Sequence, residues 1–125
     1  MAKSPKKTPN PHGRLGGPAH RREVQKASED MRTRQLNPIT EFFIRLKTGK
    51  RRFIDLVGLD QNDEVKELVQ VGKTTQSGIP IKREREAISD IEEHTGLKVR
   101  FISYTTLGLL IVFAIVFAIT QTAIL

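Results

Sequence analysis

The last 25 residues of this 125-residue chain, Phe101 to Leu125, contain no charged side chain. Residues 107–119 within that stretch contain no polar side chain at all. A helix of this length, at about 1.5 Å per residue, would span about 37 Å and exceed the roughly 30 Å hydrocarbon core of a bilayer. A buried core helix would normally be shorter and interrupted by polar positions. Residues 97–125 are therefore predicted to be a juxtamembrane segment followed by a transmembrane helix.

The residues around this apolar stretch predict its orientation. Residues 1–22 contain no apolar run of the kind a secretory signal needs. Lys98 and Arg100 lie directly before the stretch, and no Lys or Arg follows it. By the positive-inside rule, we expect a tail-anchored, single-pass integral membrane protein with a cytoplasmic N-terminus and its C-terminus on the far side. Small residues that would let another transmembrane helix approach closely are Gly108, Ala114 and Ala118.

Positive charge is concentrated in the first half of the chain. The chain has 21 Lys and Arg against 14 Asp and Glu, and residues 1–55 hold 14 of the basic and 5 of the acidic side chains. Within this half, the basic arm of residues 1–22 suits an anionic surface, whether phospholipid head groups, nucleic acid or an acidic partner subunit. A basic tail that only improves solubility is the alternative. The absence of cysteine excludes disulfides and thiolate metal sites.

Composition divides the region before the apolar stretch into three parts. Residues 1–22 are basic and rich in Pro and Gly, and are expected to be a disordered or extended arm because they have too little apolar surface to offset ordering. Residues 23–36 are good helix formers with a narrow apolar face, which predicts a weak helix. Residues 37–96 are predicted to be a small helical cytoplasmic region, with helices at 37–49, near 60–72 and at 81–96. The expected fold class is therefore mainly α.

The predicted helix over residues 37–49 has the clearest local signals. Asn37 is a favoured N-cap, Pro38 fits the first helical position, and Gly49 stands where a left-handed C-terminal cap would lie. An i, i+3, i+4, i+7 spacing would place four apolar side chains on one face, where they would contact the membrane interface or a partner helix: Ile39, Phe42, Phe43 and Leu46. Basic side chains expected to contact an anionic surface are Arg45, Lys47, Lys50, Arg51, Arg52, Lys98 and Arg100.

No arrangement of residues in the sequence predicts catalysis. There is no nucleophile with a plausible base, no carboxylate pair at a cleft and no cluster of metal ligands. Gly72-Lys73-Thr74 matches the end of a phosphate-binding loop, but Glu67 occupies the position of the earlier glycine that the motif requires. We therefore expect no enzymatic activity, no cofactor and no metal.

These observations favour a non-catalytic accessory or scaffold subunit of a larger membrane assembly, with the lipid bilayer, other membrane-protein subunits and anionic lipid as expected partners. The alternative is a membrane-tethered adapter that binds nucleic acid or the ribosome through the basic half. Small subunits of the protein-conducting channel and membrane proteins of lipid-containing virions share the plan of a cytoplasmic amphipathic helix followed by one terminal membrane helix. The sequence does not choose among these classes.

Overall fold

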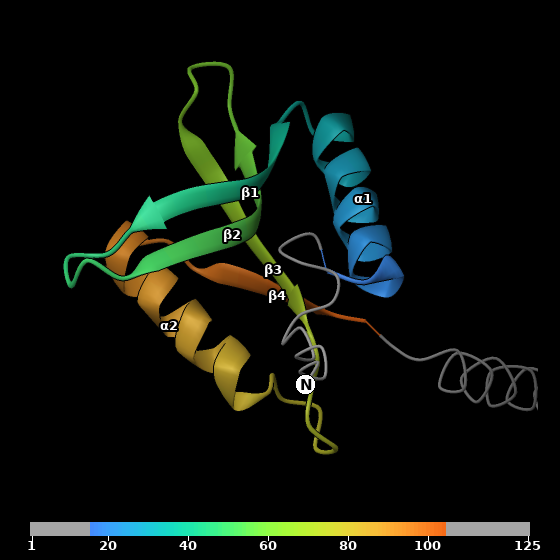
Figure 1. Cartoon of the computed structure of the whole chain (residues 1–125). Helices are drawn as coiled ribbons and strands as arrows, with labels where there is room; N and C mark the ends of the chain where they lie inside the picture. The colour runs from blue at the N-terminus through green and yellow to red at the C-terminus, as the bar shows by residue number, and fades with distance from the viewer. Residues whose placement is uncertain (1–15, 105–125) are drawn as a thin grey trace, which may run out of the picture.

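The computed structural model describes residues 16–104, which form an α/β fold with a four-stranded mixed sheet and two helices (Figure 1). The strands lie in the order β1-β2-β3-β4. Strand β2 pairs antiparallel with both β1 and β3, whereas β4 runs parallel to β3, which it follows through the crossover helix α2. The elements are α1 (Pro18–Thr33), β1 (Asn37–Arg45), β2 (Arg51–Leu59), β3 (Val65–Gly72), α2 (Lys82–Thr95) and β4 (Val99–Ser103).

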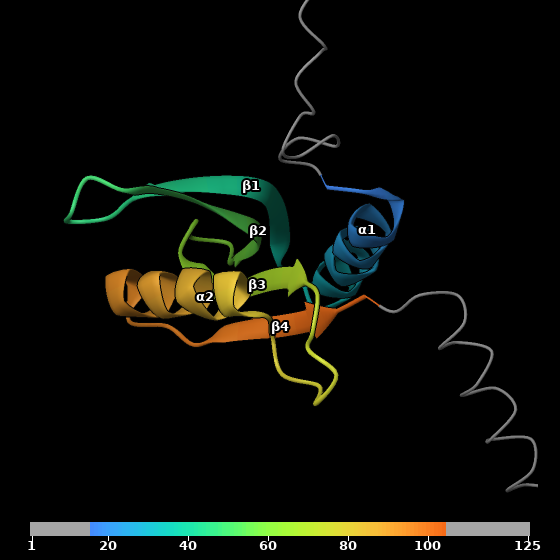
Figure 2. The ribbon, with the colours of Figure 1, turned by 60° about the horizontal axis from the view of Figure 1, so that its bottom comes forward.

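The two helices cover opposite faces of the sheet. Adjacent residues Leu68 and Val69 on β3 belong to different core clusters, as alternation along a strand requires. Helix α1 contributes Ala27 and Met31 to the cluster that contains Val69, and α2 contributes Ile91 to the cluster that contains Leu68. The β1–β2 hairpin projects away from α1 and lies alongside α2 (Figure 2).

The prediction of a helix over residues 37–49 is wrong, and with it the prediction of a mainly α fold. Residues Asn37–Arg45 form strand β1, which pairs with β2 along its length. Phenylalanine and isoleucine fit a half-buried pleated surface at least as well as a helix, and the apolar stretch of β2 offers a pairing partner. Gly49 does adopt a positive φ of 87°, but it does so in the hairpin turn, where its N–H donates to the carbonyl of Leu46 at 2.9 Å.

The prediction of a helix near residues 60–72 is also wrong. Asp60 accepts hydrogen bonds from the backbone N–H groups of Asn62 and Glu64, at 2.8 and 3.0 Å. This arrangement closes the turn between β2 and β3, and residues Val65–Gly72 continue as a strand. Acidic and amide side chains stabilise turns by the same backbone contacts with which they cap helices, so the signal at Asp60 fits both structures.

Helices are found in two of the regions where the sequence predicts them. Helix α2, Lys82–Thr95, lies within the predicted 81–96. Helix α1 overlaps the predicted 23–36 but begins earlier, at Pro18, inside the residues expected to form an arm. Proline at the first helical position and Ala27 and Met31, both buried against the sheet, account for the earlier and firmer helix.

The prediction of an integral, tail-anchored membrane protein with a cytoplasmic N-terminus is contradicted. Within residues 16–104, no helix is both long enough and apolar enough to cross a membrane. Phe101, the first residue of the uncharged stretch, lies in β4 beside Gln70 of β3. Residues 105–125, and with them Gly108, Ala114 and Ala118, lie outside the described residues.

Candidate functional site

The outer half of the β1–β2 hairpin extends beyond the rest of the sheet. Pairing between β2 and β3 stops at Leu56 and Val69, whereas pairing between β1 and β2 continues to Arg45 and Arg51. At the point where the β2–β3 ladder stops, two side chains replace it. The N–H of Asp55 donates to Gln70 Oε1 at 2.7 Å, and the N–H of Val71 donates to Asp55 Oδ2 at 2.8 Å. The hairpin therefore leaves the sheet at Asp55.

The register of the hairpin assigns its side chains to two faces, because residues directly opposite each other in an antiparallel pair lie on the same side. The inner face is turned toward α2: Ile44 and Ile54 belong to the core cluster of Ile91, and Arg52 pairs with Asp90 of α2. We call the other side the outer face of the hairpin. It consists of two opposed pairs, Phe43 with Phe53 and Arg45 with Arg51.

The two faces differ in how their positive charge is balanced. On the inner face, Nε and Nη2 of Arg52 both donate to Oδ2 of Asp90, at 3.0 and 2.7 Å, and the Arg52 side chain is only 18% exposed. On the outer face, Arg45 and Arg51 are exposed, and neither forms an ion pair with a carboxylate of the described residues. The guanidinium carbon of Arg45 lies 6.0 Å from the centre of the Phe43 ring. The outer face thus carries uncompensated positive charge beside aromatic rings.

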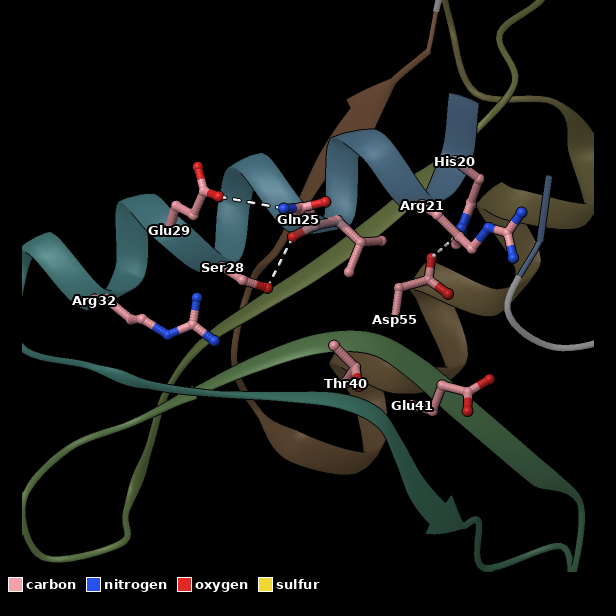
Figure 3. A pocket seen from close by; sticks show the side chains of 10 residues that line it. His20, Arg21, Gln25, Ser28, Glu29, Arg32, Thr40, Glu41 and Asp55 are labelled. Atoms are coloured by element: carbon pink, nitrogen blue, oxygen red, sulfur yellow. Dashed lines mark hydrogen bonds and ion pairs between the residues drawn. The ribbon is translucent and has the colours of Figure 1, made fainter. Parts of the chain in front are cut away.

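A cleft of about 360 Å³ lies beside the base of the hairpin, between α1 and strands β1 and β2 (Figure 3). Helix α1 contributes two exposed arginines, Arg21 and Arg32, for which no ion pair is found within residues 16–104. The strands contribute Thr40, Glu41 and Asp55. Glu41 has a positive φ of 53°, and its buried Oε1 has no hydrogen-bond partner among residues 16–104.

Several titratable groups gather where α1, β2 and α2 meet. His20 Nε2 lies 3.3 Å from Asp55 Oδ2 (Figure 3), and the His20 ring packs edge-on against Tyr104. Glu84 of α2 lies close to Gly72, where a Cβ atom would come within 2.6 Å of its carboxyl carbon, so a side chain at position 72 would displace it. Burial raises the pKa of Glu84 above its ordinary value of 4.5, an effect that nearby Arg83 partly offsets.

Replacing Glu84 with glutamine is expected to stabilise the protein near neutral pH. The folded protein raises the pKa of Glu84, so it binds a proton on this carboxyl group more tightly than the unfolded chain does. Protonation of Glu84 therefore favours the folded state, and this contribution to stability is lost as pH rises above about 4.5. Glutamine keeps the shape without the buried charge. The urea midpoint of Glu84→Gln should exceed that of the parent at pH 7, and the two should converge below pH 4.5. Glu86→Gln, at an exposed position of α2, is the control and should show no such gain. A lower midpoint for Glu84→Gln at pH 7 would contradict the expected sign.

The structure separates the side chains that the sequence placed on one helical face. Phe42 and Leu46 pack toward α2, Ile39 is half-buried, and Phe43 is 44% exposed on the other side. The basic residues predicted to contact an anionic surface are only partly brought together. Arg100, on β4, pairs with Glu67 at 3.2 Å, and Lys98 is exposed just before β4. The hairpin holds the remaining five, which are Arg45, Lys47, Lys50, Arg51 and Arg52.

Comparison with protein-family models, with curated proteins and with solved structures finds no match to this chain. Within residues 16–104, no group of three or more His, Asp or Glu side chains is placed to hold a metal ion.

Sequence reasoning missed the outer face of the hairpin and the cluster around Asp55. The alternation Phe43, Arg45 on one strand and Arg51, Phe53 on the other was the available signal, because residues two apart share a face in a strand. In a helix, by contrast, Phe43 and Arg45 would point in different directions. The contacts of Asp55 with Gln70 and His20 had no local signal, since they join residues far apart in the sequence.

Proposed function

We propose that this domain binds nucleic acid through the outer face of the β1–β2 hairpin. The observation that carries the proposal is that Arg45 and Arg51 lie directly opposite each other on the two strands, next to the rings of Phe43 and Phe53. Both arginines are exposed, and neither has a carboxylate partner among residues 16–104. Guanidinium groups offer fixed pairs of N–H donors that match phosphate oxygens, and aromatic rings accompany them where bases are also contacted.

The energetics of the cross-strand pair favour an anionic ligand. Like charges directly opposite each other destabilise an antiparallel pair of strands. Asp90 of α2 neutralises Arg52 on the inner face, whereas no carboxylate among residues 16–104 pairs with the arginines of the outer face. A polyanion that contacts both arginines would remove their mutual repulsion and add two charge-assisted contacts.

The surroundings of the outer face support the same ligand. Lys47 is exposed in the hairpin turn, and Arg21 and Arg32 line the cleft at the base of the hairpin. Three carboxylates also line the cleft, and one of them, Asp55, is paired with His20. Because carboxylates disfavour a phosphate nearby, we expect the outer face of the hairpin, and not the cleft, to bind phosphate. The whole chain carries a net charge of +7, which would attract nucleic acid from a distance.

The probe is a fluorescein-labelled single-stranded oligonucleotide, longer than the roughly 4–16 nucleotides that a small single-strand-binding domain covers. Its binding to the protein should weaken steeply as the salt concentration rises. If Arg45, Lys47 and Arg51 each neutralise one phosphate, the slope of log K against log salt is expected to be about −2. Arg51→Gln should reduce the size of this slope by about 0.7, as loss of one phosphate contact requires. Because the substitution also relieves repulsion with Arg45, the variant should be no less stable than the parent. Fluorescence anisotropy and urea unfolding measure the two quantities.

Lys82→Gln is the matched control, because it removes one positive charge from an exposed position of α2. Helix α2 lies on the side of the hairpin opposite to the outer face. This substitution should leave the slope almost unchanged. Vesicles rich in anionic phospholipid provide a second comparison, and the parent should bind them more weakly than the oligonucleotide at equal salt. Equal losses for Arg51→Gln and Lys82→Gln, or binding to vesicles alone, would contradict the proposal.

The predicted role as a non-catalytic accessory or scaffold subunit stays a prediction, and no helix within residues 16–104 is long and apolar enough to cross a membrane. The expected absence of enzymatic activity stays a prediction. Nuclease activity in particular is testable with the same labelled oligonucleotide, whose length after incubation with the protein and magnesium should be unchanged on a denaturing gel.

A further inference from the structure

We infer that the hairpin selects nucleic acid with exposed bases, because Phe43 and Phe53 form a platform on which an unpaired base stacks. This inference rests on the proposed function and specifies its substrate class: a single strand or an unpaired loop, not a continuous duplex. The two rings belong to opposed residues of β1 and β2, so strand pairing fixes them side by side.

The geometry of the platform leaves one ring available. The ring centres of Phe43 and Phe53 are 5.4 Å apart with an angle of 57° between their planes, so the rings support each other without covering both faces. Phe53 is half-buried, whereas Phe43 is 44% exposed. Of the large apolar side chains among residues 16–104, only Phe43 and Ile79 are exposed to this degree. The fold therefore leaves the Phe43 ring partly exposed, with the guanidinium carbon of Arg45 6.0 Å from its centre.

Charge complementarity identifies the occupant. An apolar protein partner would have to bury Arg45 and Arg51 together, and leaving two like charges without counter-ions in an interface is costly. A nucleic acid strand supplies a phosphate for each guanidinium and a flat, apolar base for the ring. In an intact duplex the faces of the bases are covered by their neighbours, and exposing one requires unstacking. A single strand offers the base without that cost.

The test compares three probes against the full chain: a single-stranded oligothymidylate, a strand of the same length in which the bases are replaced by abasic sites, and a duplex of the same length. We expect the base-bearing strand to bind about tenfold more tightly than the abasic strand, as stacking of one base predicts. The duplex should bind less tightly than the base-bearing strand. Phe43→Leu, which keeps an apolar side chain of strand-compatible size, should abolish most of the difference between the two single strands.

Phe43→Trp is the matched variant that keeps an aromatic face. It should retain the preference for bases, which separates loss of stacking from a general disturbance of the hairpin. The chain contains no tryptophan, so this substitution also introduces a single reporter fluorophore. Its fluorescence should be quenched when the base-bearing strand binds and should be almost unaffected by the abasic strand. Circular dichroism of both variants should match that of the parent.

The outcomes distinguish this inference from the proposed function. If the parent binds base-bearing and abasic strands equally while Arg51→Gln still reduces the salt slope, the stacking platform is wrong and nucleic acid binding stands. If Phe43→Leu keeps the preference for bases, the platform is likewise overturned. If no probe binds in a salt-dependent manner, the proposed function fails. Binding of polyglutamate as tight as that of oligothymidylate, with the same dependence on Phe43, would identify an acidic protein partner and overturn the inference.

Discussion

Replacing Asp55 with alanine is expected to lower the free energy of unfolding by about 3 kcal/mol, because it leaves a buried donor without an acceptor. Val71 is 2% exposed, and its N–H donates to Asp55 Oδ2 at 2.8 Å. The same carboxylate lies 3.3 Å from His20 Nε2, where both side chains are largely buried. The alanine variant would lose both contacts at the position where the β2–β3 ladder stops. Urea unfolding followed by circular dichroism measures the loss.

Asp55→Asn is the control that separates hydrogen bonding from charge. Asparagine keeps an oxygen that can accept from the N–H of Val71, while it removes the negative charge beside His20. We expect this variant to lose about 1 kcal/mol, well below the loss for alanine. Equal losses for the two variants would mean that the charge next to His20, and not the acceptor for Val71, accounts for the stability that Asp55 provides.

The principal error of the sequence reading, at residues 37–49, has a definite physical origin. Ile39, Phe42, Phe43 and Leu46 fit the helical period, and Asn37, Pro38 and Gly49 fit helix ends. Every one of these signals is local. The competing signal was the apolar run of residues 53–59, which forms β2 and pairs with β1 from Leu59 back to Arg51. Pairing between strands is decided by tertiary context, which overrides helix propensity.

Helix α2 shows which features of the fold local signals in the sequence can predict. Its end is marked by Gly96, whose φ of 73° lies in the left-handed region, and its narrow apolar stripe is enough to cover one face of a small sheet. The alternation of Leu97, Val99 and Phe101 with charged residues was visible in the sequence, and its last part, from Val99, belongs to β4. It was interpreted as a juxtamembrane segment because of the apolar stretch that follows.

The candidate site, like the fold, was predictable from the sequence only in part. The cluster of basic residues at 45–52 was identified from the sequence, and an anionic ligand was among the expectations. The sequence did not predict which basic side chains remain free to bind an anionic ligand. Arg51 and Arg52 are neighbours in sequence and differ only in the face of the hairpin on which they lie. The pairing of Arg52 with Asp90 joins residues 38 positions apart, and it takes one arginine out of the set available to a ligand.

Replacing Ile91 with alanine is expected to be as costly as any single substitution in the core of this domain. Ile91 is fully buried among Ile44, Ile54, Val57 and Leu68, and it and Ala87 are the two buried apolar residues of α2. Removing a buried isoleucine side chain down to Cβ lowers the free energy of unfolding by about 2–5 kcal/mol, through lost transfer energy and the cavity left behind. The half-buried Ile88 of the same helix provides the control.

Ile88→Ala gains the same helix propensity as Ile91→Ala, so the difference between the two variants in urea unfolding isolates the packing of Ile91. We expect Ile91→Ala to lose at least about 2 kcal/mol more than Ile88→Ala. Because α2 also carries Asp90, which neutralises Arg52, a loosened α2 would release a third arginine at the hairpin. The folded fraction of Ile91→Ala should therefore bind the oligonucleotide at least as tightly as the parent does. Equal losses from Ile88→Ala and Ile91→Ala would show that α2 does not depend on Ile91 for its attachment to the sheet.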